Sequence, residues 1–123
     1  MTTIKTHVFV AVVVFFAALA LMHAERAEAY DNYAAMAYSY STGNYGYGYN
    51  YDTQWGAEDR ALAECRAYDC EIVVWVMNGC LSMAANDYGG IGTGWAADYY
   101  GAENDALYDC GGGCWIVETV CTD

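Results

Sequence analysis

Basic residues are scarce in this 123-residue chain, which has four lysines and arginines against sixteen aspartates and glutamates. The formal net charge is -12. Affinity for nucleic acid comes mainly from cationic side chains that displace counterions from phosphates. The charge balance therefore excludes nucleic acid as the expected partner.

Histidine is absent after residue 29, and this absence bears on catalysis. Serine hydrolases and cysteine proteases usually need an imidazole base beside the nucleophile. We therefore interpret Ser39, Ser41 and Ser82 as ordinary turn or strand serines. The glycine-rich stretch 89–94 has no following Gly-Lys-Ser/Thr, so we interpret it as turn and strand glycine, not as a phosphate loop.

Long hydrophobic runs are also missing, apart from fifteen uncharged residues from Val8 to Met22. That run is shorter than the roughly 20 residues of a membrane-spanning helix. It is typical of a secretory signal, and Ala27-Glu28-Ala29 has the small-x-small form that signal peptidase accepts. We predict that residues 1–29 are a cleaved signal peptide, with Ala24 as a poorer cleavage site and an uncleaved membrane anchor as the alternative. After cleavage we expect no membrane partner.

The remaining residues, 30–123, are enough for one domain. They carry two arginines, no lysine and fourteen carboxylates, so the whole net charge of -12 belongs to them. A domain this small buries little surface, and like charges oppose its compaction. All six cysteines lie here, and an exported domain favours disulfides. We expect a secreted, disulfide-stabilised protein in the medium, the cell wall or the periplasm.

An internal repeat organises these residues. Residues 55–65 and 100–110 both read aromatic-Gly-Ala-Glu-x-x-Ala-Leu-x-x-Cys without a gap. Two copies are too few for a solenoid. We predict a single duplicated domain, with repeat one at about 33–80 and repeat two at about 81–121.

Each repeat predicts a β-hairpin, a helix and a closing strand. Alanine, leucine and cysteine form one apolar stripe on each helix, and Asp52 or Thr53 and Asp98 are suitable N-caps. The fold class is α+β: two pseudo-symmetric hairpin-helix-strand repeats forming one antiparallel or mixed sheet with two packed helices. The expected strands are 34–40, 45–51, 71–78, 81–85, 91–97 and 115–121. We expect 71–78 to be buried on both faces because only its ends are polar.

The cysteine spacing predicts a pairing. A short turn separates the cysteine that ends each helix from the one that begins the next strand, which favours Cys65–Cys70 and Cys110–Cys114. Cys80 and Cys121 remain, and we place their bridge across the pseudo-twofold axis between the repeats. Reduced thiolates from the two short pairs could instead hold zinc. Export argues against that alternative, so we expect no metal and no cofactor.

The motifs of the first repeat resemble a known family. They are Ala57 to Cys65, then Asp69-Cys70, Val73-Val74-Trp75 and Asn78-Gly79-Cys80. The chain is similar to the secreted bacterial family catalogued as domain of unknown function 4189, over essentially all of residues 30–123. The resemblance implies export, and the family has no established activity to carry over.

Tyrosine is the most distinctive residue after position 29. Tyr45, Tyr47, Tyr49 and Tyr51 alternate with Gly46, Gly48 and Asn50, so a regular strand would place all four rings on one face. The rings could cover the core while the glycine face packs closely. They could instead form an exposed surface for protein or carbohydrate contact.

Two functions follow. We favour a non-enzymatic module that contacts a protein or glycan partner through the tyrosine-rich hairpin. The alternative is a small secreted hydrolase using carboxylates alone, with Glu58, Glu103 and Asp98 as candidates. The favourable interaction of an early helical carboxylate with the helix dipole accounts for the two glutamates without catalysis.

Overall fold

A computed structural model describes residues 30–123. The predicted signal peptide and its cleavage site lie outside the described residues. The order of elements in the first half of the described part, strand-strand-helix-strand, recurs in the second. The elements are β1 (Tyr33–Tyr38), β2 (Tyr45–Tyr51), α2 (Gln54–Cys65), β3 (Glu71–Met77), β4 (Cys80–Ala85), β5 (Ile91–Ala96), α3 (Tyr99–Cys110) and β6 (Trp115–Cys121).

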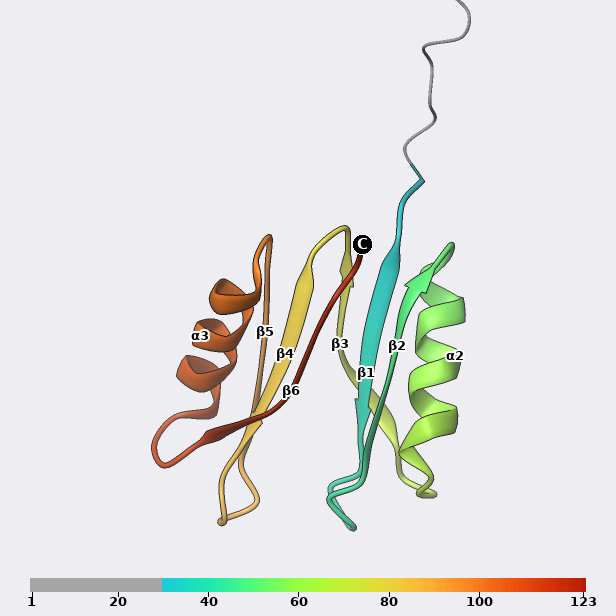
Figure 1. Cartoon of the computed structure of the whole chain (residues 1–123). Helices are drawn as coiled ribbons and strands as arrows, with labels where there is room; N and C mark the ends of the chain where they lie inside the picture. Colours follow the sequence, from blue (N-terminus) through green and yellow to red (C-terminus); the bar gives the residue numbers. More distant parts are fainter. Residues whose placement is uncertain (1–29) are drawn as a thin grey trace, which may run out of the picture.

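The strands form two antiparallel sheets of three strands, in the orders β2-β1-β3 and β5-β4-β6. The sheets lie against each other, with α2 on the outer face of the first and α3 on the outer face of the second (Figure 1). The predicted α+β class, two helices and disulfide stabilisation are confirmed. The predicted single sheet is replaced by two, because each sheet has one face covered by its helix and buries the other against its counterpart.

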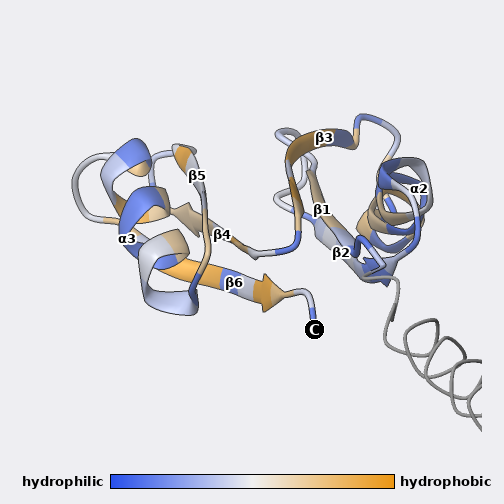
Figure 2. Cartoon of the chain, turned by 90° about the horizontal axis from the view of Figure 1, so that it is seen from above, coloured by the Kyte–Doolittle hydropathy of each residue, from blue (hydrophilic) through white to orange (hydrophobic). Residues whose placement is uncertain are grey.

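The main core lies between the sheets. It consists of alternate residues of three strands, Ala34, Met36, Val74, Val76, Leu81 and Met83. Val117 and Val120 of β6 and the rings of Tyr45 and Tyr47 of β2 pack at its margin. In the view from above, the hydrophobic colour gathers on strands such as β3 and β6, while the helices outside are largely polar (Figure 2).

A second core layer joins α2 to the first sheet through small side chains. Ala57, Ala61 and Cys65 of the helix meet Ala35 and Ala37 of β1. Before its last two residues, strand β2 presents only Gly46 and Gly48 to the helix. A Cβ at Gly46 would lie 2.3 Å from the carbonyl oxygen of Ala61, so glycine is what allows this close approach.

Strand β3 differs from expectation. We predicted burial on both faces, yet Trp75 and Met77 are each 46% exposed, while Val74 and Val76 face the core. The reason is the position of α2, which lies mainly over β1 and β2. The outer face of β3 therefore stays partly open.

The helix starts agree with the sequence. Thr53 caps α2 by accepting a hydrogen bond from the Gly56 N–H, and Asp98 caps α3 by accepting one from the Gly101 N–H. Neither α2 nor α3 has the length and apolarity to cross a membrane.

Candidate functional site

A groove follows the outer edge of β2. Its larger part, about 640 Å³, is lined by residues 45–49, Tyr51, Arg60 and Glu64. A smaller hollow of about 320 Å³ continues past the end of the strand and is lined by residues 43–45 and 64–66. Strand β2 is an edge of its sheet. The groove therefore has strand backbone between a wall of tyrosines and a wall formed by α2.

The tyrosine wall combines the two alternatives left open by the sequence. Tyr45 and Tyr47 are partly buried and pack against the core between the sheets. Tyr49 is 49% exposed, and its ring stacks on Tyr47 with centroids 6.3 Å apart. The inner rings thus cover the core, and the outer ring extends their surface into solvent.

The Tyr51 ring lies on the opposite face of β2 from Tyr45, Tyr47 and Tyr49. The prediction that all four rings share one face is therefore wrong for Tyr51. Tyr33 pairs with Tyr51 and Ala35 with Gly48, so β2 has one extra residue between these pairs. Asn50 takes a positive φ of 61° at this bulge. An extra residue reverses the alternation of side chains, and Tyr51 therefore packs on the helix side of the sheet with Tyr33.

The helix wall carries charges that the sequence analysis did not single out. Arg60 and Glu64 form an ion pair of 3.0 Å, and Arg66 lies 4.0 Å from the same carboxylate. Arg60 and Arg66 are the only basic residues in positions 30–123. Both line this groove. Because basic residues are so rare in this acidic chain, their rarity could have identified Arg60 and Arg66 as candidate binding residues from the sequence.

Charge also acts on the tyrosine wall from the second sheet. The nearby carboxylate of Glu118 on β6 is the main cause that raises the pKa of Tyr47, and burial raises it further. Both causes favour the neutral phenol. The Tyr47 side chain therefore stays neutral to a higher pH than an ordinary tyrosine.

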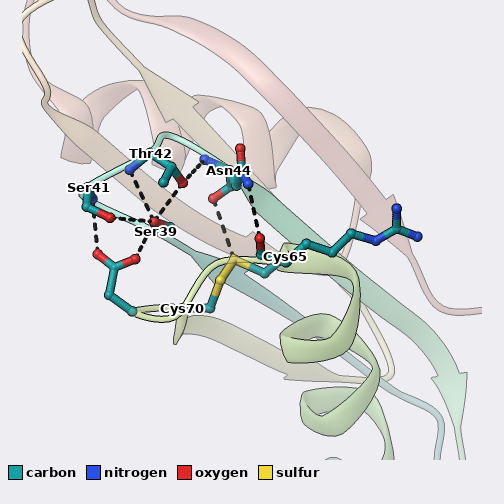
Figure 3. The surroundings of a disulfide bond; sticks show 8 residues. Ser39, Ser41, Thr42, Asn44, Cys65 and Cys70 are labelled. Carbon is teal, nitrogen blue, oxygen red and sulfur yellow. Dashed lines mark hydrogen bonds between the residues drawn. A yellow bond between two sulfur atoms is a disulfide. The ribbon is translucent and has the colours of Figure 1, made fainter.

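A polar clamp holds the β1–β2 turn at one end of the groove (Figure 3). The buried Ser39 hydroxyl donates to Asp69, and Ser41 N–H donates to the same carboxylate. The Thr42 N–H and hydroxyl donate to the Ser39 oxygen. The Ser39 hydrogen bond is the main cause that lowers the pKa of Asp69. These serines act in the turn.

The six cysteines form three disulfides, Cys65–Cys70, Cys110–Cys114 and Cys80–Cys121. The first ties the end of α2 to the start of β3, beside the polar clamp (Figure 3). Cys80 is the first residue of β4 and pairs directly with Cys121 of β6. The long bridge therefore lies within the second sheet, and not across the two halves as we expected.

The candidate catalytic carboxylates are not brought together. Glu58 of α2 accepts a hydrogen bond from the Gln54 side chain of the same helix. Glu103 of α3 accepts one from the Thr119 hydroxyl of β6. The helices lie on opposite outer faces, with both sheets between them (Figure 1). Asp98 is occupied as the N-cap of α3. Within residues 30–123 no cluster of three or more histidine, cysteine or acidic residues is arranged to hold a metal.

Comparison with known proteins agrees with this architecture. The family model described as domain of unknown function (DUF4189) matches residues 33–121, which include every strand and helix described above. The chain belongs to this family. The similarity noted from the sequence motifs is therefore confirmed.

One solved relative shares the fold of this DUF4189 protein. The NMR structure of Rv1813c from Mycobacterium tuberculosis superposes with a TM-score of 0.60 at 30% sequence identity. The match covers 73% of this chain and 74% of that one. No curated protein gives a significant match.

Proposed function

We propose that this DUF4189 protein is an exported, non-enzymatic binding module, and that its binding surface is the groove along β2. The observation that carries the proposal is the composition of that groove. The groove is lined by Tyr45, Tyr47 and Tyr49 and by both arginines of residues 30–123, a segment that is otherwise acidic. Tyrosine supplies rigid apolar area with a polar tip, and tyrosine and arginine are enriched where binding energy concentrates.

Export is part of the proposal and is supported by two features. The sequence of residues 1–29 has the form of a signal peptide. The three disulfides use every cysteine of the chain and suit an oxidising compartment.

The test is a binding screen of the disulfide-bonded protein against peptide and glycan arrays. Tyr49→Ser and Arg60→Ala change exposed side chains of the groove, and we expect each to weaken binding by about tenfold. Tyr88→Ser is the matched control, because Tyr88 is 94% exposed on the β4–β5 turn. A ligand that binds both groove variants as well as the wild type would overturn the proposal.

A further inference from the structure

The backbone of β2 has an unpaired side. The Ser39 N–H donates to the carbonyl of Asn44 at 2.8 Å, which makes these residues a hydrogen-bonded pair of the β1–β2 hairpin. Such pairs alternate along antiparallel strands. Gly46 therefore directs its N–H and C=O toward β1, while Tyr45 and Tyr47 direct theirs away from the sheet, into the groove.

The corresponding edge in the second half has one of its outward amides hydrogen-bonded to a helix side chain. Thr93 of β5 occupies the position of Tyr47, and its outward N–H donates to Asp109 Oδ2 at 2.9 Å. Glu64 precedes Cys65 as Asp109 precedes Cys110, but its carboxylate is paired with Arg60 instead. No side chain of the described residues accepts a hydrogen bond from the Tyr47 N–H. Among the described residues, α3 therefore satisfies one outward amide of its edge strand, whereas the matching Tyr47 amide has no side-chain acceptor on α2.

Open edges usually carry features that block pairing with another chain, such as lysine, proline or a bulge. Strand β2 has neither lysine nor proline. Its bulge comes only at Asn50, at the end of the strand. The stretch from Tyr45 to Tyr49 is thus an unblocked edge long enough for a short strand to add.

We propose that this groove binds an extended, acidic peptide segment of another protein as an added β-strand on β2. This inference rests on the proposed function and names its ligand class. Main-chain hydrogen bonds to the strand would supply affinity, and side chains alternating along the peptide would meet the two walls.

The acidic character follows from charge. Arg60 lies directly over the strand, because a Cβ at Gly48 would be only 2.8 Å from the Arg60 Cβ. Arg60 also lines the hollow along this strand, so a strand added there would lie next to its side chain. An arginine binds carboxylates by charge-assisted hydrogen bonds, and Glu64 is the only carboxylate among the residues that line the two hollows.

The first experiment tests strand pairing from the ligand side. Peptides of strand length are selected from a random display library on the disulfide-bonded protein, and dissociation constants are measured by fluorescence anisotropy. N-methylation of the selected peptide at alternate residues removes N–H donors on one edge only. We expect methylation in one register to weaken binding at least about tenfold and the shifted register to change it little.

The second experiment tests the protein side with matched variants. Tyr47→Thr removes the ring but keeps the N–H, whereas Tyr47→Pro also removes the N–H that faces the groove. Proline is tolerated on an edge strand where its missing N–H faces outward. We expect Tyr47→Pro to bind the peptide at least about tenfold more weakly than Tyr47→Thr. Amide NMR spectra of both variants check the fold.

The outcomes separate the two proposals. Acidic peptides with register-dependent methylation effects, weakened by Arg60→Ala, support the added strand. If peptides or glycans bind through Tyr49 and Arg60 without sensitivity to methylation, the added strand is overturned and the binding module stands. Failure to select any peptide also overturns the added strand.

The added peptide strand is likewise overturned if the wild-type protein forms a homodimer that Tyr47→Pro dissociates, because a second copy of the chain would then occupy the edge of β2. Ligands unaffected by every groove variant overturn both.

Discussion

Asp109 accepts a hydrogen bond from the backbone N–H of Thr93, with 2.9 Å between Oδ2 and N. This α3 carboxylate thereby occupies one outward amide on the outer edge of the second sheet. At the corresponding place in the first half, Glu64 is drawn to Arg60, 3.0 Å away, and the edge of β2 stays open. The two halves, similar in architecture, therefore differ in the partner of this helical carboxylate, which is a backbone amide in one and Arg60 in the other.

This difference predicts unequal amide exchange at the two edges. We expect the Thr93 amide to exchange hydrogen more slowly than the Tyr47 amide, because only the former is hydrogen-bonded. Asp109→Ala should raise the Thr93 exchange rate by roughly tenfold, the cost of one such bond. Exchange followed by NMR measures both. Asp105→Ala, one turn earlier on α3, is the control and should leave the Thr93 rate unchanged. Equal rates at the two amides in the wild type would contradict this account of the edges.

The contact of β2 with α2 predicts a severe effect of one methyl group. A Cβ at Gly46 would meet backbone atoms of Ala61 and Cys65 at 2.3 and 2.4 Å. The helix must move to accept it, so Gly46→Ala should cost more than about 2 kcal/mol in the free energy of unfolding. Gly112→Ala is the control, because a Cβ there meets nothing within 4 Å. Urea denaturation should show the control within about 0.5 kcal/mol of the wild type.

The disulfides should contribute unequally to stability. Cys80 and Cys121 are 41 residues apart in the chain, and Cys110 and Cys114 only 4. In the loop-entropy account the long bridge contributes about 4 kcal/mol and the short one about 2. The double variant Cys80→Ala/Cys121→Ala should therefore unfold at a lower urea concentration than Cys110→Ala/Cys114→Ala. The reverse order would show that loop entropy does not govern these bridges.

The clamp at the β1–β2 turn predicts an acid-dependent stability. Hydrogen bonds from Ser39 and Ser41 lower the pKa of Asp69 in the folded state below its ordinary value of 3.8. The unfolded chain then takes up a proton first as the pH falls, so the stabilisation is present above about pH 4 and lost below it. Asp69→Asn should melt at a lower temperature than the wild type at pH 7, and the difference should shrink on acidification.

The matched control for the clamp is Asp87→Asn. Asp87 is exposed in the β4–β5 turn, and its carboxylate makes no hydrogen bond within residues 30–123. Its melting temperature should follow the wild type at every pH. A gap between Asp69→Asn and the wild type that persists undiminished at pH 2 would argue against the carboxylate as its source.

Local features could be predicted because they depend on neighbouring residues. The N-caps Thr53 and Asp98 follow from hydrogen bonding within one turn, and the short disulfides follow from the few residues between their cysteines. Strand β6 has the bounds predicted for it. The sequence places Cys80 at the end of repeat one, but it begins β4 of the second sheet, because a strand that begins after a tight turn is not marked by periodicity.

The groove could not be derived in the same way. The tyrosine alternation predicts four rings on one face, but the bulge at Asn50 turns Tyr51 to the opposite face. That bulge is stabilised from a distance, by hydrogen bonds between Asn50 and Asp123 at the C-terminus. Likewise, nothing near Arg60 in the chain shows that its stem lies over Gly48.

The sequence by itself determined the acidity, the two short cysteine pairs, the helices and the strands, because charge, spacing and periodicity are properties of short segments. Only the tertiary structure decided that the strands divide into two facing sheets, since this depends on which apolar faces bury each other. It also decided that Asp109 binds an outward amide at one sheet edge, while the other edge lies between tyrosines and arginines. A free edge exists only relative to the strands and helices around it.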